Sequence, residues 1–309
     1  MAASDPLVSV VLPTFNRERS VGKAIESVLR QTYTRLEVLV VDDASTDGTP
    51  ELVRGLGDAR IVYLRQDDNR GGSAARNRGL SAARGELIAF QDSDDEWLPH
   101  KLERQVGLLT RSTESTGVIY CPYRRIYADG RTETHPADPA AAPRGEIHHE
   151  LLRGNFVGTP TILARRSCCD SVGGFDEALP RFQDWDWMIR VSRHWQVGFV
   201  EEPLVLAGHE SDNITDGHSA ALVTAERRLV EKHLDALRGA GADVLAHRLW
   251  HLAHVSIMQG SAAEGRKALR RALRTRFRLP WVGLGLLSLV PPLYRAAYRW
   301  TRGNKGHRS

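Results

Sequence analysis

The first hundred residues alternate between short, mainly apolar runs and segments in which apolar residues recur at helical spacing. Four such runs are present: Val8 to Leu12, Leu36 to Val41, Ile61 to Leu64 and Leu87 to Phe90. Short apolar runs that end in turn-forming or acidic residues are typical of buried strands. We therefore predict four strands in this part of the chain.

The segments between the runs predict helices. Helical spacing is clearest after the first run, at Val21, Ala24, Ile25, Val28 and Leu29. Asn16 precedes these residues and is expected to cap their helix. Further helices are predicted over Pro50 to Leu56 and Gly72 to Ala83. The alternation of strand and helix predicts an α/β fold with a mostly parallel sheet that is covered on both faces.

Polar residues follow three of the four predicted strands. They form the segments Pro13 to Asn16, Asp42-Asp43 and Asp92-Ser93-Asp94. In sheets of this kind, the polar site lies beyond the carboxyl ends of the strands. Carboxylates at i and i+2 are able to converge on one Mg²⁺ or Mn²⁺ ion that also binds a diphosphate. A solvated acidic loop is the alternative for a short acidic cluster taken alone.

Composition narrows the class of protein. The chain has 309 residues, of which 41% are hydrophobic and 26% charged, so it is long enough for one large domain with an appendage and is not disordered throughout. Its three cysteines, Cys121, Cys168 and Cys169, are too few for a disulfide framework and lack the paired spacing of a zinc site. They favour a reducing cytosol. We see no signal-peptide pattern at the N-terminus and expect none.

The charge is distributed unevenly along the chain. Residues 1–215 contain 25 Lys and Arg against 32 Asp and Glu, whereas residues 216–309 contain 17 against 6. The two parts are therefore expected to meet different partners, and the basic part suits an anionic surface.

Five motifs follow one another in order over much of the chain. They are Val10 to Arg17, Val40 to Gly48, Gly71 to Gly79, Phe90 to Asp95, and Gly173 to Asp176 followed by Gln183 to Asp186. Together they resemble the inverting family 2 glycosyltransferases of the GT-A fold, over roughly residues 7–215. The resemblance implies a GT-A catalytic domain over 1–215, with a mostly parallel central sheet. Residues 216–309 would form a basic, α-helical C-terminal extension.

The resemblance also implies roles for individual residues. It assigns binding of the donor nucleotide to Pro13, Thr14, Phe15, Asn16, Asp43, Gly72, Arg76 and Asp92. Asp43 would accept a hydrogen bond from the base, unless it is a plain turn carboxylate. Arg76 would face a phosphate or Asp94, with a structural ion pair as the alternative. Asp92 would lie on the ribose side.

Metal binding is implied for two residues. Asp94 resembles the direct ligand of the cofactor, Mn²⁺ or Mg²⁺. His209 begins a His-x-x-x-Asn-x-Thr segment, which makes it a second candidate ligand. Asp95 is expected instead to cap a helix that begins near Trp97.

The catalytic base should be a carboxylate on the face of the sugar opposite the diphosphate, so that one in-line displacement inverts the anomeric centre. The segment Gln183-Asp184-Trp185-Asp186 aligns with the family's acidic motif, although the usual first acid is Gln183 here. Asp184 is the preferred base and Asp186 is its rival. A helix cap at the start of Trp185 to His194 is the structural alternative for Asp184.

The C-terminal part predicts a helical hairpin, Leu245 to Met258 and Ala262 to Arg276. Leu279 to Tyr294 has no charged residue, but it is too short and too interrupted by glycine and proline to span a bilayer. Its aromatic and arginine flanks favour peripheral docking on an anionic membrane. A core or dimer helix with a solvated basic tail remains equally open.

These observations predict a metal-dependent inverting glycosyltransferase in the cytoplasm or peripheral on the inner face of the cell membrane. The donor would be a UDP- or dTDP-sugar and the acceptor a saccharide or lipid-linked saccharide in cell-surface glycan assembly, with no nucleic acid partner. A dinucleotide oxidoreductase is disfavoured because no Gly-x-Gly-x-x-Gly follows the first strand. A non-catalytic module that binds nucleotide sugars is the other alternative.

Overall fold

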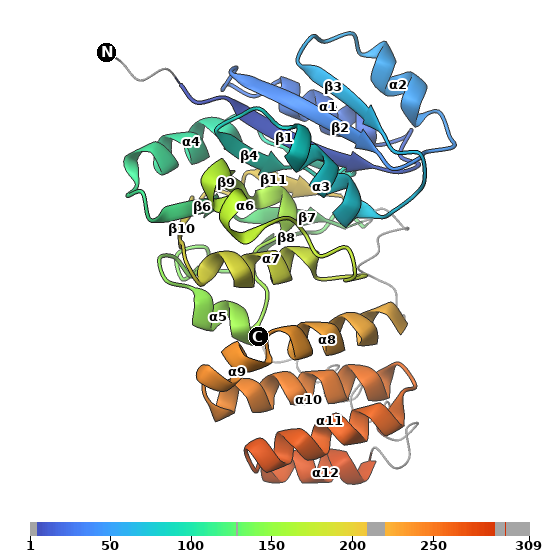
Figure 1. Cartoon of the computed structure of the whole chain (residues 1–309), viewed down its shortest axis with the longest axis vertical. Coiled ribbons are helices and arrows are strands. Elements are labelled where there is room, and N and C mark those ends of the chain that lie inside the picture. The colour runs from blue at the N-terminus through green and yellow to red at the C-terminus, as the bar shows by residue number, and fades with distance from the viewer. Residues whose placement is uncertain (1–4, 128, 209–219, 288–293, 295–309) are drawn as a thin grey trace. The chain divides into compact units, whose positions relative to one another are not determined.

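The computed structural model describes residues 5–127, 129–208, 220–287 and 294 (Figure 1). The chain forms two compact units. The first, here called the sheet unit, comprises Met1–Glu177 and Gln183–Asn213; the second, the helical unit, comprises Ala178–Phe182 and Ile214–Ser309. That the catalytic domain comprises residues 1–215 and the C-terminal extension residues 216–309 stays a prediction.

The sheet unit is built on a seven-stranded sheet in the order β10-β6-β9-β4-β1-β2-β3. Its strands are β1 Val8–Thr14, β2 Leu36–Asp42, β3 Ile61–Arg65, β4 Leu87–Phe90, β6 Thr116–Tyr120, β9 Leu163–Arg165 and β10 Gln196–Phe199. Only β9 runs against its neighbours, β4 and β6. The four strands predicted from the apolar runs are all present, and the expected α/β fold with a mostly parallel sheet is confirmed.

Helices cover both faces of this sheet, as the alternation predicts. The helices of the sheet unit are α1 Val21–Leu29, α2 Thr49–Gly55, α3 Gly72–Ala82, α4 Lys101–Arg111, α5 His148–Arg153, α6 Arg166–Val172 and α7 Gln183–Ser192, with a short 3-10 turn at Thr159–Thr161. Val10 in β1 and Ile25 in α1 share one buried core. Val11 points to the other face, where a Cβ on Gly79 of α3 would lie 2.4 Å from its Cγ1. Glycine at 79 therefore allows α3 to approach the sheet closely.

A second, four-stranded sheet has the order β5-β11-β7-β8. Its strands are β5 Asp95–Trp97, β11 Val205–Ala207, β7 Tyr123–Ile126 and β8 Thr132–His135. Since β5 begins at Asp95 and α4 only at Lys101, the prediction that Asp95 caps a helix is wrong. Its carboxylate instead accepts a hydrogen bond from the backbone N–H of Gly208, at 3.2 Å.

The predicted helix cap at Asn16 is also wrong. Helix α1 begins at Val21, five residues later, with Ser20 before it. Asn16 has a left-handed backbone, with φ of 51°, and its side-chain oxygen accepts a hydrogen bond from Thr46 N–H at 2.8 Å. Asn16 therefore joins the loops after β1 and β2, and it does not start a helix.

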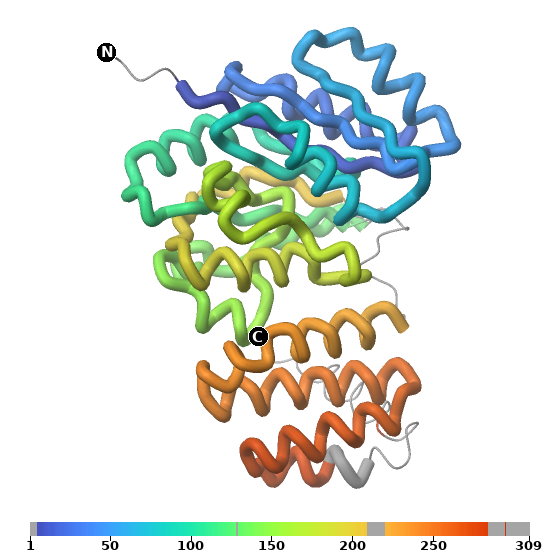
Figure 2. Tube along the Cα trace, in the orientation of Figure 1, coloured from blue at the N-terminus to red at the C-terminus, as the bar shows by residue number. Residues whose placement is uncertain are grey.

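The helical unit consists of α8 Ala220–Lys232, α9 Leu234–Gly239, α10 Ala242–Met258, α11 Ala262–Thr275 and α12 Leu279–Leu287. Helices α10 and α11 form the predicted hairpin and lie side by side (Figure 2). A Cβ on Gly265 would meet Ala253 O at 2.8 Å, so glycine permits their close contact. None of the helices in the described ranges has the length and apolar character that crossing a membrane requires.

Candidate active site

The register of the large sheet brings the predicted polar segments to one edge. In the parallel pair of β1 and β2, Thr14 lies opposite Asp42. Just beyond β4, the N–H of Gln91 donates to Val11 O at 3.0 Å. The chain segments that follow β1, β2 and β4 therefore start close together, as expected for a site at the carboxyl ends of parallel strands.

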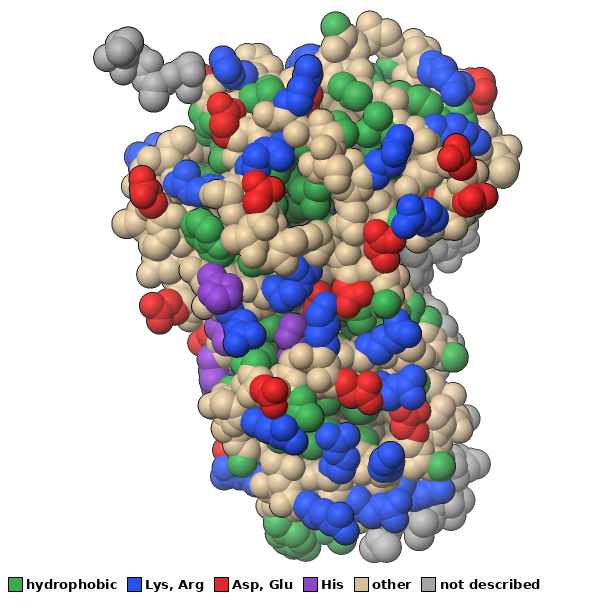
Figure 3. Space-filling model, in the orientation of Figure 1, with side chains coloured by type: hydrophobic (Ala, Val, Ile, Leu, Met, Phe, Trp, Pro, Cys, Tyr) green, Lys and Arg blue, Asp and Glu red, His purple; other side chains and the backbone are tan. Residues whose placement is uncertain are grey.

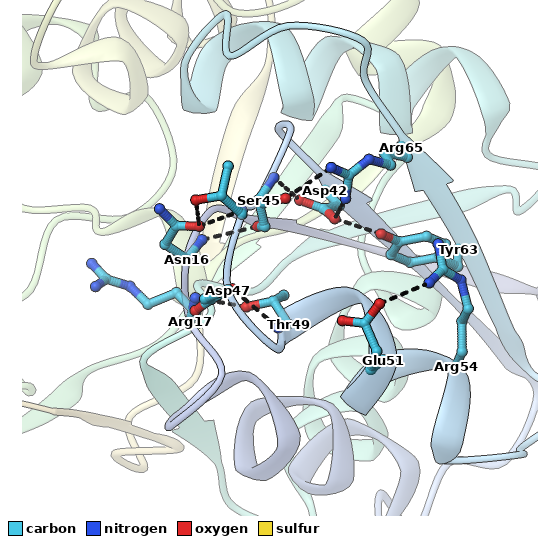
Figure 4. A network of polar contacts seen from close by, with 11 residues as sticks. Asn16, Arg17, Asp42, Ser45, Asp47, Thr49, Glu51, Arg54, Tyr63 and Arg65 are labelled. Carbon is cyan, nitrogen blue, oxygen red and sulfur yellow. Dashed lines mark hydrogen bonds and ion pairs between the residues drawn. The ribbon is translucent and has the colours of Figure 1, made fainter.

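A polar network holds the loops after β1 and β2 in one conformation (Figure 4). Asp42, fully buried at the end of β2, accepts hydrogen bonds from Ser45 N–H and from Arg65, each at 2.8 Å, and a further one from the Tyr63 hydroxyl. Ser45 in turn accepts from Asn16 N–H at 2.9 Å. Asp42 thus has a scaffold role, and the loop that begins at Asn16 is fixed from the β2 side.

Asp43, the predicted acceptor for the base, organises the segment that leads to α3. One of its carboxylate oxygens accepts from the Gln66 side chain and from Arg70 N–H, and the other accepts from Gly71 N–H at 2.7 Å. The segment from Gln66 to Gly71 is thereby drawn against the end of β2. Each carboxylate oxygen has two lone pairs, so the oxygen bonded to Gly71 retains acceptor capacity.

Several buried side-chain polar atoms lack hydrogen-bond partners among the described residues, and two of these atoms belong to predicted nucleotide-binding residues. They are the hydroxyl of Thr14 and the Nε of Arg76. Because buried polar groups are almost always hydrogen-bonded in native proteins, such atoms fit a place where a ligand supplies the partner. Nearby along the chain, Phe15 is 41% exposed, so its ring is available to a ligand.

Arg76, on α3, makes a close ion pair with Asp92, with 2.6 Å between Nη2 and Oδ1. Its guanidinium also lies over the ring of Phe175, 5.7 Å from the centroid. Arg76 therefore pairs with Asp92. The predicted alternative in which Arg76 faces Asp94 is not what the structure shows. A close Arg–Asp pair leaves the other guanidinium N–H groups able to bind a phosphate.

Contacts at both ends hold the acidic loop between β4 and β5 in place. The side chain of Gln91 donates to Asp95 O at 2.7 Å. Gly208, which follows β11, lies so close that a Cβ there would be 2.7 Å from Asp94 O. Burial raises the pKa of Asp95 well above its ordinary value, and the negative charges of Asp92 and Asp94 add to this effect. The loop therefore gathers three carboxyl groups, those of Asp92, Asp94 and Asp95, within electrostatic range of one another.

The carboxylates of the acidic loop fit a hard divalent cation that shares its coordination with phosphate oxygens. In the described part of the chain, no group of three His, Cys, Asp or Glu side chains is arranged to hold a metal alone. Mg²⁺ is commonly held by one or two carboxylates together with substrate phosphates and water. Asp94 Oδ2 lies 4.0 Å from Arg17, and its side chain is 19% exposed. The second predicted ligand, His209, lies outside the described residues.

Asp184, the preferred base, lies in the first turn of α7. Its Oδ1 accepts from Trp185 N–H at 2.8 Å, and its Oδ2 accepts from the amide of Asn155 at 3.3 Å. Burial raises the pKa of Asp184, the Arg76 charge lowers it and the Asp92 charge raises it. Asp184 is therefore within electrostatic range of the Arg76–Asp92 pair, and its environment shifts it toward the basicity that a proton acceptor needs.

Asp186, the rival base, is fully buried. Its Oδ2 forms an ion pair with Arg190 one helical turn later, at 3.0 Å. The neighbouring Trp187 packs against Phe90 and Phe175 in the core. This arrangement favours a structural role for Asp186 and leaves Asp184 as the more accessible carboxylate.

Two residues near the site were not singled out from the sequence. Arg17 was part of the first motif but had no role assigned. Its guanidinium extends away from the loop network (Figure 4), and its Nη2 lies 4.0 Å from Asp94 Oδ2. Asn155 follows α5 and belongs to none of the motifs, so no signal in the sequence connects it to Asp184, 29 residues away.

The chain is similar to known proteins. The model of the family described as "Glycosyl transferase family 2" matches residues 9–171. Among curated proteins, the chain is 35% identical over 163 residues to UDP-Glc:alpha-D-GlcNAc-diphosphoundecaprenol beta-1,3-glucosyltransferase WfgD of Escherichia coli, an alignment that covers 53% of this chain and 62% of WfgD. The chain spans somewhat less than two thirds of the length of the first curated relatives.

Solved structures show the same fold. S. aureus TarS 1-349 in complex with UDP-GlcNAc has a TM-score of 0.70 at 18% identity, covering 96% of this chain and 92% of TarS 1-349. Mannosyltransferase PcManGT from Pyrobaculum calidifontis in complex with GDP-Man and Mn²⁺ has a TM-score of 0.59 at 21% identity, covering 96% and 83%. At these identities the likeness concerns the fold alone, and it confirms the predicted GT-A class with C-terminal helices.

Proposed function

Because the chain belongs to glycosyl transferase family 2, we propose that it moves a sugar from a nucleotide-diphosphate sugar to a hydroxyl of a saccharide or lipid-linked acceptor, with inversion. One observation carries the proposal. The carboxylate of Asp184 is electrostatically coupled to Arg76 and Asp92, which lie beside the anionic loop at the end of β4. The proposed proton acceptor and the proposed diphosphate site thus belong to one cluster.

The nucleotide would bind at the loops that follow β1 and β2. Thr14 and Phe15 offer an unpaired hydroxyl and an exposed ring, and Asp43 retains an acceptor position for a base N–H. Gly72 is the first residue of α3. A Cβ at this position would lie 3.0 Å from an Arg76 nitrogen, so glycine leaves room for that guanidinium. Pro13 and Asn16 shape the same loop from the β1 side.

Transfer would then be one displacement at the anomeric carbon. Asp184 accepts the proton of the acceptor hydroxyl, whose oxygen forms a bond to the anomeric carbon. The bond from that carbon to the diphosphate oxygen breaks at the same time, and its electron pair leaves with the nucleoside diphosphate. Because the oxygen attacks from the face opposite the leaving group, the configuration at that carbon inverts. Asn155 holds Asp184 through its Oδ2.

A divalent cation, Mn²⁺ or Mg²⁺, would be held by Asp94, and His209 is the second candidate ligand. When bound, such an ion offsets the negative charge that develops on the departing diphosphate. Arg76 places a further positive charge beside the same loop.

The relatives suggest the kind of substrates. The name of WfgD specifies a UDP-glucose donor and a diphosphoundecaprenol-linked acceptor, and the TarS complex contains UDP-GlcNAc. We therefore propose a UDP- or dTDP-sugar as donor, a lipid-linked saccharide as acceptor, and a role in cell-surface polysaccharide biosynthesis. The GDP-mannose complex of PcManGT makes GDP-sugars the first alternative donors.

A donor panel tests the proposal. Hydrolysis or transfer of UDP-, dTDP- and GDP-sugars by the purified chain would be measured by nucleoside diphosphate release, with and without MnCl₂. We expect release from a uridine or thymidine donor, stimulated by the metal. Tight binding of the same donors without release under any condition would instead identify a module that binds nucleotide sugars without catalysis.

A further inference from the structure

Helix α11 in the helical unit carries an exposed row of positive charge. The row consists of Lys267, Arg270, Arg271 and Arg274, all exposed. Residues at these spacings share one face of a helix. The opposite face, with Gly265, Ala268, Leu269 and Ala272, is buried against the rest of the unit. Lys and Arg side chains gather visibly over α11 (Figure 3).

Acidic side chains of the described residues do not neutralise this basic row. Within the described ranges, none of its four members forms an ion pair, although ion pairs are common elsewhere in the chain, such as Arg238 with Asp235. Just beyond the row, Arg276 and Arg278 both pair with the single carboxylate of Asp243. The face therefore carries a surplus of positive charge that an anionic partner would neutralise.

Two large apolar side chains follow the basic row. Phe277 is 70% exposed and Leu279 is 72% exposed, well above the other exposed large hydrophobic residues described, of which Phe15 at 41% comes next. The segment that bears them is anchored, because Trp281 is buried and stacks on Trp250 with ring centroids 6.0 Å apart. Arg278 lies over the Trp281 ring, 5.2 Å from its centroid. Phe277 and Leu279 thus project from a segment that is anchored to the unit.

We infer that the basic row of α11, together with Phe277 and Leu279, docks the protein on an anionic lipid bilayer. The row would meet lipid phosphates, each basic residue strengthening attachment about fivefold near an anionic leaflet. Phe277 and Leu279 would enter the boundary between headgroups and acyl chains, where exposed aromatic and aliphatic side chains are buried. A soluble polyanion would neutralise the charges of the row, but it offers no apolar phase in which Phe277 and Leu279 could be buried. For this reason the bilayer is the partner that the surface fits.

Vesicle binding tests this inference without any sugar transfer, so its outcome is independent of the proposed reaction. The full chain would be cosedimented with vesicles of equal parts phosphatidylglycerol and phosphatidylcholine, and with pure phosphatidylcholine. We expect pelleting with the anionic vesicles only, weakened by salt because the phosphate contacts are screened. The variant K267Q/R270Q/R271Q/R274Q should bind at least about tenfold more weakly. These side chains are exposed, so thermal unfolding should be unchanged.

A matched control removes the same charges from the sheet unit. Lys23, Arg35, Arg111 and Arg193 are also exposed and form no ion pair within the described residues, so K23Q/R35Q/R111Q/R193Q should bind anionic vesicles nearly as well as the unmodified chain. Equal losses in both quadruple variants would contradict the inference, since they would indicate a response to net charge alone. Absence of binding by the unmodified chain would also overturn it.

The apolar part of the inference has its own test. F277S/L279S keeps every charge, and it should lose the vesicle binding that persists at high salt. Binding to a soluble polyphosphate should be unaffected by this change. If the double variant binds vesicles as the unmodified chain does, and both bind polyphosphate equally through the α11 row, the surface recognises an anionic polymer and the bilayer proposal is wrong.

Discussion

The two charged regions of this protein are constructed in opposite ways. At the ends of β1, β2 and β4 the charges are buried or partly buried and tied to named partners, as in the bonds from Gln66, Arg70 and Gly71 to Asp43. On α11 the charges are exposed, and none of the four in the basic row is paired within the described residues. The first region is acidic and the second is basic.

The difference teaches what each region is able to recognise. A preorganised cluster holds its groups in fixed positions, which suits a small ligand and a reaction that depends on geometry. A row of flexible, solvated cations has little geometric selectivity, and it suits an extended anionic surface whose attraction is screened by salt. Substitutions in the acidic cluster should therefore change the rate of sugar transfer and the affinity for nucleotide. Substitutions on α11 should change only the binding of the protein to membranes.

The largest effect is expected from Asp184→Asn. The amide keeps the shape of the side chain but cannot take a proton from the acceptor. Transfer should therefore fall by about two to four orders of magnitude while donor affinity is retained. Single-turnover transfer assays and donor titration calorimetry measure the two quantities.

Asp186→Asn is the matched control for that change. It disrupts a buried pair with Arg190, so it should lower the free energy of unfolding by about 1–3 kcal/mol and leave transfer by the folded enzyme largely intact. If Asp186→Asn abolishes transfer and Asp184→Asn does not, the base has been assigned to the wrong carboxylate.

The next effect is expected from Asp94→Ala. Loss of this carboxylate should remove most of the dependence of nucleoside diphosphate binding on Mn²⁺, a coupling that is typically about 5- to 150-fold in affinity. Calorimetry with UDP, with and without MnCl₂, measures it. Asp170→Ala removes an exposed acid on α6 and should change nothing. Unaltered coupling in folded Asp94→Ala would rule out its role as a metal ligand.

A smaller effect is expected from Gly208→Ala, which alters the acidic loop without touching a carboxylate. The added Cβ would lie 2.7 Å from Asp94 O, so either β11 or the loop has to shift. We expect a loss of about 1–3 kcal/mol in the free energy of unfolding, as for other overpacked sites, together with weaker Mn²⁺-dependent UDP binding. Gly55→Ala, with no atom within 4 Å of its added Cβ, should show neither change in calorimetry or thermal unfolding.

The subtlest effect concerns pH. As the proposed base, Asp184 would accept a proton only when it is ionised, so transfer should decrease as the pH falls through its raised pKa. The hydrogen bond from Asn155 stabilises the ionised form and lowers that pKa. Asn155→Ala should therefore move the acid limb of the kcat profile to higher pH, and Asn155→Asp should move it further by adding negative charge. A uniform fall in rate with an unmoved limb would assign Asn155 a purely structural role.

Local patterns in the sequence predicted the elements well. The strands at Val8, Leu36, Ile61 and Leu87 were evident because short apolar runs have few alternatives in an α/β chain, and the α10–α11 hairpin because its apolar spacing is helical. The errors arose where side chains find distant partners. Asn16 bonds to Thr46 and Asp95 to Gly208, 30 and 113 residues away, so local capping rules could not have identified either contact.

The arrangement of the site was harder to predict from the sequence than the fold was. Motifs marked Asp92, Asp94 and Asp184, but the pairing of Arg76 with Asp92 depends on how α3 packs on β1 and β2, which no motif encodes. Asn155 illustrates the limit most clearly, because a lone asparagine after a short helix has no pattern and matters only through its place beside Asp184.

The anomeric configuration of the product tests the central claim most directly. The protein would be supplied with a UDP-sugar whose anomeric bond is α and with a saccharide acceptor, and the first product would be examined by proton NMR. A single displacement with Asp184 as base predicts a β-linked product. An α-linked product, formed at the same rate by the unmodified chain and by Asp184→Asn, would contradict the account.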